Sequence, residues 1–88
     1  MSDINNWYSL GNKYYNEKNY TEALKYYMLA ANQGHAGAQK FVGACYEFGL
    51  GIQEDYTEAI KWYRKAAEQG SKQAAEKAKM LENKLPKQ

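Results

Sequence analysis

Tyr20-Thr21-Glu22-Ala23-Leu24-Lys25-Tyr26-Tyr27 returns further along the chain as Tyr56-Thr57-Glu58-Ala59-Ile60-Lys61-Trp62-Tyr63. A second pair of segments follows, in which Ala30-Ala31-Asn32-Gln33-Gly34 matches Ala66-Ala67-Glu68-Gln69-Gly70. Both pairs recur after 36 positions, from Tyr20 to Tyr56 and from Gly34 to Gly70. A fixed period of this size is typical of a solenoid, in which each repeat contacts only its neighbours.

The first part of each repeat recurs at a shorter distance. Leu10-Gly11-x-x-Tyr14 matches Val42-Gly43-x-x-Tyr46, and Tyr46 stands 32 positions after Tyr14. The second copy therefore contains four additional residues between its two halves, within Gly49-Leu50-Gly51-Ile52-Gln53-Glu54. Insertions collect in surface loops. Each repeat is thus predicted to be two elements joined by a turn, which is longer and glycine-containing in the second copy.

The elements have the periodicity of helices. Trp7, Leu10, Gly11 and Tyr14 recur at three- and four-residue steps, and no segment alternates with period two for long. Helices are therefore predicted over residues 4–17, 20–33, 36–48, 56–69 and 71–84.

The expected helix ends carry suitable residues. Asn19 and Asp55 each stand three residues before a glutamate, which is typical of a helix N-cap. Gly34 and Gly70 stand where a left-handed C-terminal cap is needed. Pro86, the only proline, is expected to follow the last helix.

The two copies resemble two related repeat families. The first resembles a tetratricopeptide repeat, through Trp7-x-x-Leu10-Gly11-x-x-Tyr14, Ala23-x-x-x-Tyr27 and Ala30, and departs from it at His35, where that family has proline. The second resembles a Sel1-like repeat, through Val42-Gly43-x-Cys45-Tyr46-Glu47-x-Gly49-x-Gly51-Ile52, Asp55, Ala59, Trp62-Tyr63-Arg64-Lys65-Ala66-Ala67 and Gly70.

The resemblance implies a right-handed αα-solenoid, all-α, with two helical hairpins and a C-terminal capping helix. A single domain is expected over residues 1–88, with repeats at 4–35 and 36–70, the capping helix at 71–84 and a tail at 85–88. In the capping helix Ala74, Ala75, Ala78 and Leu81 are expected to point inward, and Lys72, Glu76, Lys79 and Glu82 to face water. We do not expect function in this helix first.

The composition excludes several functional classes. The 88 residues carry a net charge of +2 and one cysteine, so no internal disulfide framework is expected. Residues 1–6 lack the basic start and apolar run of a secretory segment, and no run is long enough to span a membrane. We therefore expect a cytoplasmic protein. The basic excess after Gly70 is interpreted as solvated lysines, so neither a nucleic acid nor a membrane partner is predicted.

Residues with catalytic potential have simpler interpretations. Cys45 is expected in the core and His35 in an exposed loop, and together they make no metal site. Gly49-x-Gly51 lacks the context of a phosphate loop and is interpreted as a turn with positive φ angles. We therefore predict no catalytic, cofactor or metal site, no cofactor and no enzyme activity.

The resemblance also implies a binding groove on the concave side, lined by the first helix of each repeat. Carried onto this chain, the groove residues of the first copy are Asn5, Tyr8, Asn12, Tyr15 and Asn16. Those of the second copy are Lys40, Ala44, Glu47 and Phe48. The alternative is that Tyr15 and Phe48 only pack around the turns.

Two functions remain. The first is a protein–protein interaction module that binds a peptide or protein segment in this groove. The second is a structural or self-associating scaffold, natural or engineered, in which two copies form a homodimer to gain burial. The resemblance also permits a comparison with chaperone-binding tetratricopeptide domains, which grip the carboxylate of an acidic C-terminal tail. Tyr8 and Phe41 stand where those domains have lysine and asparagine, so capture of such a tail is not expected.

Overall fold

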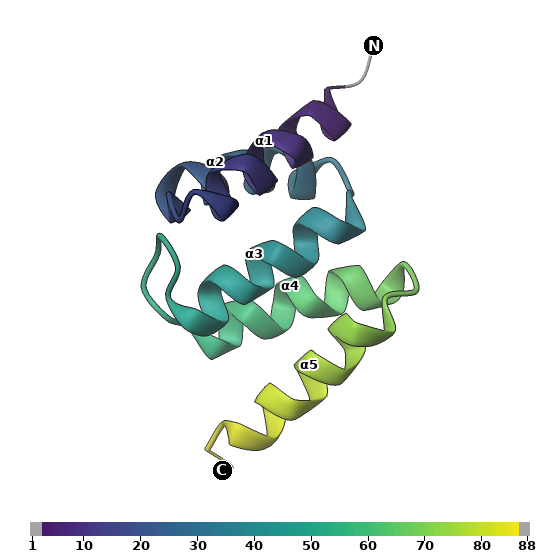
Figure 1. Cartoon of the computed structure of the whole chain (residues 1–88). Coiled ribbons are helices and arrows are strands. Elements are labelled where there is room, and N and C mark those ends of the chain that lie inside the picture. Colours follow the sequence, from purple (N-terminus) through teal and green to yellow (C-terminus); the bar gives the residue numbers. More distant parts are fainter. Residues whose placement is uncertain (1–2, 87–88) are drawn as a thin grey trace.

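The computed structural model describes residues 3–86; the first two and last two residues of the predicted domain and tail lie outside this range. Five helices follow one another within it: α1 (Ile4–Asn16), α2 (Tyr20–Asn32), α3 (Ala36–Phe48), α4 (Tyr56–Glu68) and α5 (Lys72–Lys84). Each helix packs against the next, and α1 and α5 lie at opposite ends of the stack (Figure 1). The stack measures 45 × 26 × 16 Å. The prediction of an all-α repeat solenoid is confirmed.

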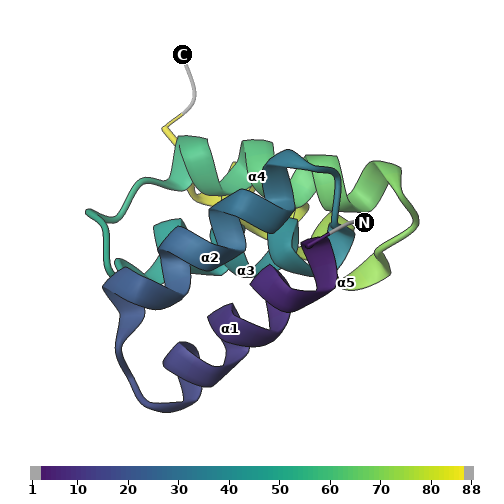
Figure 2. The ribbon, with the colours of Figure 1, turned by 90° about the horizontal axis from the view of Figure 1, so that it is seen from above.

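The stack twists along its length. Seen from above, the hairpin of α1 and α2 is inclined to α4 rather than parallel to it (Figure 2). Successive helix pairs in solenoids are related by such small rotations, which curve the array and create a concave side.

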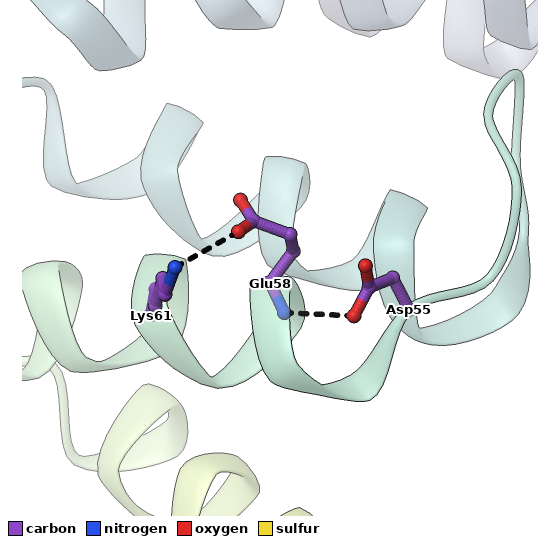
Figure 3. A network of polar contacts seen from close by, with 3 residues as sticks. All are labelled: Asp55, Glu58 and Lys61. Carbon is purple, nitrogen blue, oxygen red and sulfur yellow. Dashed lines mark hydrogen bonds and ion pairs between the residues drawn. The ribbon is translucent and has the colours of Figure 1, made fainter.

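The helix ends agree with the prediction to within one residue. Ser71 lies just before α5, and its Oγ accepts a hydrogen bond from the Ala74 N–H at 3.2 Å. Asp55 caps α4 as expected, since its Oδ1 accepts from the Glu58 N–H at 3.1 Å (Figure 3). The predicted glycine caps are also confirmed, because Gly34 and Gly70 have φ angles of +93° and +103°.

Two residues beside the helix starts differ in part from the prediction. The side chain of Asn19 makes no cap hydrogen bond. Asn19 still occupies the predicted N-cap position of α2, and its N–H donates to the Tyr14 carbonyl at the end of α1 at 2.9 Å. His35 does not lie in an exposed loop: its Nδ1 accepts from the Ala38 N–H at 3.0 Å, and its ring stacks on Tyr8 at 4.3 Å.

A glycine in the first helix of each repeat lies against a tyrosine in the second. A Cβ built on Gly11 would stand 2.6 Å from Cδ1 of Tyr27, and one on Gly43 would stand 2.8 Å from the ring of Tyr63. The two rings are 0% and 1% exposed. Carbon atoms in normal contact are about 3.5–4.0 Å apart, so only a residue without a side chain fits opposite either ring.

The inserted loop of the second repeat packs back onto the first. Leu50 and Ile52 contact the hydrophobic cluster formed by α1, α2 and α3. Gly49 and Gly51 have φ angles of +68° and +74°, as expected for this turn. A Cβ on Gly51 would stand 2.6 Å from the Tyr20 carbonyl oxygen at the start of α2. The loop is therefore a contact between repeats.

Replacing Gly11 with alanine tests the first of these contacts. Gly11→Ala is expected to destabilise the protein by about 1–3 kcal/mol, because the new methyl overlaps a buried ring that has no free space beside it. The better helix propensity of alanine, worth about 1 kcal/mol, opposes this loss only in part. Urea unfolding followed by circular dichroism measures the difference.

Asn6→Ala is the matched control, since Asn6 is exposed on the same helix. It adds an alanine without a new contact, so its unfolding free energy should be equal to or slightly above that of the wild type. A Gly11→Ala protein as stable as Asn6→Ala would contradict the close packing of the tyrosine ring.

Alanine at the two loop glycines tests the contact between repeats. Both substitutions place a side chain at positive φ, which costs about 1–2 kcal/mol. Gly51→Ala is expected to cost more than Gly49→Ala, because the Cβ at Gly49 meets no atom closer than 3.6 Å. Equal unfolding free energies for the two variants would show that the loop does not rest on α2.

Candidate binding surface

A hollow of about 510 Å³ lies between α3 and α5. Its lining comes from these two helices and from one tyrosine of α4; the residues are Lys40, Phe41, Ala44, Phe48, Tyr63, Gln73, Glu76, Lys77 and Met80. Three of the residues predicted for the groove, Lys40, Ala44 and Phe48, are among them. The structure thus brings the second-repeat part of the predicted groove together with α5.

The hollow contains most of the large exposed apolar side chains. Within residues 3–86 these are Phe48, Met80 and Leu29, with exposed fractions of 59%, 41% and 39%. Phe48 and Met80 line the hollow, whereas Leu29 lies on α2. An apolar patch bordered by polar residues is typical of an interaction site.

The charged side chains of the hollow differ in their partners. The Lys40 ammonium donates to the neutral Oε1 of Gln73 at 2.7 Å. The Lys77 ammonium lies 3.5 Å from Oε1 of Glu47 and 5.3 Å from the centre of the Phe48 ring. Among the described residues neither Lys40 nor Glu76 forms an ion pair. Lys40 is therefore the lining cation whose charge no carboxylate balances.

Glu47 does not face the groove as expected, since only 4% of it is exposed. Its Oε1 accepts a hydrogen bond from the Tyr63 hydroxyl at 2.7 Å and pairs with Lys77. Burial, together with the hydrogen bond to Glu47, raises the pKa of Tyr63, so the phenol remains a donor. One signal in the sequence was available: Glu47 stands one turn after Gly43, on the face that receives Tyr63.

The first-repeat part of the predicted groove is occupied by its own side chains. Phe41 stacks on Tyr27 at 4.9 Å and also contacts Tyr8 and Tyr15, at 6.2 and 5.5 Å between ring centres. Oδ1 of Asn12 accepts from the Tyr27 hydroxyl at 2.5 Å. Tyr8, Asn12 and Tyr15 are half-buried here.

Two predicted groove residues of α1 take no part in this packing. Asn5 and Asn16 are exposed, and neither lines the hollow between α3 and α5. The alternative that Tyr15 and Phe48 only pack around the turns holds for one of the two. Tyr15 packs among aromatic rings, whereas the side chain of Phe48 is exposed.

The last helix does more than cover the end of the core. Ala74, Ala78 and Leu81 are buried against α4 as expected, but Ala75 is exposed and Glu82 is half-buried in an ion pair with Arg64. Ala75 lines a second hollow, on the side of α5 toward Arg64, Ala67 and Glu68 of α4. The side of α5 toward α3 contributes Gln73, Glu76, Lys77 and Met80 to the hollow.

The remaining reactive side chains have structural partners. Asp55 caps α4, and Glu58 lies 3.1 Å from the Lys61 ammonium (Figure 3). Cys45 is fully buried, and burial raises the pKa of its thiol to about 11. Residues 3–86 contain no group of three or more histidine, cysteine or acidic side chains placed to hold a metal ion. None of their helices combines the length and the apolar character that a membrane span requires.

Comparison with known proteins supports the repeat assignment. Residues 4–35 match the family model of the tetratricopeptide repeat, and residues 36–71 match that of the Sel1 repeat. A solved structure, a Sel1 repeat protein from Oxalobacter formigenes, is 48% identical over 69% of this chain with a TM-score of 0.67. The match covers 25% of that protein's chain, so the matched part of this chain corresponds to about a quarter of its length. No curated protein matches this sequence.

Thiol chemistry tests the burial of Cys45. The folded protein is expected to react very slowly, at about pH 8, with an aromatic disulfide reagent that releases a coloured thiolate. The protein thiolate is the nucleophile in this exchange, and the Cys45 thiol is buried and protonated. The same protein in concentrated urea should release one equivalent of chromophore quickly. Rapid reaction of the native protein would show that Cys45 is accessible.

Proposed function

This chain belongs to the tetratricopeptide and Sel1 repeat proteins, which generally serve as protein–protein interaction modules, and we propose that it binds a protein segment between α3 and α5. The residues that bind it are those of the hollow, with Phe48 and Met80 at its centre. Binding involves no chemistry on the bound segment.

One observation carries this proposal: two of the three large apolar side chains exposed within residues 3–86 line the same hollow. A volume of about 510 Å³ falls within the range of roughly 300–1,000 Å³ that is usual for ligand pockets. Such a space admits one or two large side chains of a partner. Aromatic and methionine side chains are also enriched in the centres of protein interfaces.

The predicted groove ran along α1 and α3, whereas the groove proposed here lies between α3 and α5. The predicted residues Lys40, Ala44 and Phe48 remain in it, together with residues of α5. Tyr8 and Tyr15 of α1 support it indirectly, because they pack against Phe41 and so hold α3 in position. Asn12 contributes through Tyr27, whose hydroxyl donates to it and whose ring stacks on Phe41. Glu47 is assigned to the support of Tyr63 and Lys77 rather than to contact with the partner.

The exposed residues at the two ends of the stack do not favour the alternative of end-to-end self-association. In α3 the side chains that pack on the preceding helix are Ala38, Val42 and Cys45, all fully buried. The matching positions of α1, 32 residues earlier, include the exposed polar residues Asn6 and Lys13. At the other end of the stack, Lys79 of α5 occupies the position that Gly43 has in α3, 36 residues earlier. Its side chain would keep a tyrosine of a second copy from approaching α5 as closely as Tyr63 approaches α3.

A library of random peptides displayed on phage, selected against the purified chain, tests the proposal. We expect selected peptides to lose about tenfold or more in affinity for Phe48→Glu and Met80→Glu, since truncating a central interface residue often costs 2 kcal/mol or more. Leu29→Glu is the matched control, because it places the same charge on the exposed apolar residue outside the hollow.

Two results would overturn the proposal. The first is that no peptide is enriched over the starting library, and the second is that peptides bind Phe48→Glu and Met80→Glu as well as the wild type. Light scattering over a range of protein concentrations accompanies the selection. A stable dimer that dissociates in Met80→Glu would assign the hollow to a second copy of the chain.

A further inference from the structure

We infer that the bound segment carries a bulky apolar side chain and, about three residues away from it, an acidic side chain whose carboxylate pairs with Lys40. The separation follows from α3, on which Lys40 precedes Phe48 by two turns, roughly 12 Å. This inference rests on the proposed function and specifies the partner's chemistry at the same hollow. The apolar side chain lies against Phe48 and Met80, and the acidic residue lies at the end of the hollow where Lys40 contacts Gln73.

Lys40 is held in place before any partner binds. Its ammonium donates to Gln73 on α5 at 2.7 Å, and it lies 5.9 Å from the centre of the Phe41 ring. Both neighbours are neutral, so the positive charge is positioned without being balanced. A carboxylate that reaches it gains a charge-assisted hydrogen bond with little loss of side-chain entropy.

Lys77, the other lining cation, is less available. Its charge is balanced by Glu47, which is 4% exposed and also accepts from Tyr63. Drawing Lys77 toward a partner would leave a buried carboxylate without its cation, which is strongly unfavourable. A carboxylate of the partner therefore pairs with Lys40 in preference to Lys77.

Glu76 makes the hollow electrostatically asymmetric. This residue of α5 lines the hollow and has no ion-pair partner among the described residues. It repels an acidic side chain placed beside it, whereas Lys40 attracts one at the end of the hollow where it contacts Gln73. Attraction at one place and repulsion at another together give specificity for the position of the acidic residue.

The peptides from the selection described above test the inference directly. Peptides selected on the wild type should be enriched in aspartate or glutamate at a fixed spacing of about three residues from a bulky apolar residue. Selection on Lys40→Glu should enrich lysine or arginine at that place and keep the apolar residue. An individual wild-type peptide should bind Lys40→Glu about five- to tenfold more weakly, the size expected when an exposed ion pair becomes a repulsion.

A double-substitution cycle separates the contact from a general charge effect. Replacing the peptide's acidic residue with its amide should weaken binding to the wild type but not to Lys40→Gln, because the partner charge is already absent there. Lys79→Glu is the matched control, since Lys79 is exposed on the side of α5 away from the hollow. It should leave peptide affinity almost unchanged.

The outcomes distinguish this inference from the function on which it rests. Peptides that depend on Phe48 and Met80 but show no acidic preference would overturn the inference and leave the proposed function standing. An equal loss of affinity in Lys79→Glu and Lys40→Glu would also overturn it, because the effect would then be long-range. If no peptide binds at the hollow, the proposed function itself fails.

Discussion

The contact between a helical glycine and a buried tyrosine ring is the constraint on which both repeats depend. Gly11 faces Tyr27 and Gly43 faces Tyr63, each so closely that a Cβ would overlap the ring. The two helices of each hairpin can therefore approach each other closely where the ring lies between them. The tyrosine hydroxyl then reaches a polar side chain of the first helix, which is Asn12 in one repeat and Glu47 in the other. The spacing of each hairpin follows from this contact.

The same contact leads to different surfaces in the two repeats. In the first, Tyr8, Tyr15 and Phe41 fill the space in front of Tyr27. In the second, Tyr63 donates to Glu47, which pairs with Lys77, so that α3, α4 and α5 are connected beneath the hollow. The small side chain of Ala44 leaves the hollow open above them. One end of the array is thus packed with its own aromatic rings, and the other keeps an open hollow.

Much of the fold could be predicted from the sequence because its signals are local. The repeat period, the three- and four-residue spacing of apolar residues and the glycines at helix ends located all five helices to within one residue. The extra residues between the two halves of the second repeat indicated where the inserted loop lies, and in the structure it spans residues 49–55. A third of the residues that line the candidate site could also be predicted, since Lys40, Ala44 and Phe48 follow from the periodicity of one helix together with the family resemblance.

The sequence by itself determined the helices, their order and the repeat spacing, because these depend on residues within a few turns of one another. Only the tertiary structure decided that Glu47 is buried, that His35 caps α3 beside Tyr8 and that α5 lines the hollow. Each depends on a contact between distant residues, such as Lys40 with Gln73, 33 positions apart. The exact rotation of one helix against another selects such contacts, and no periodicity in the chain records that rotation.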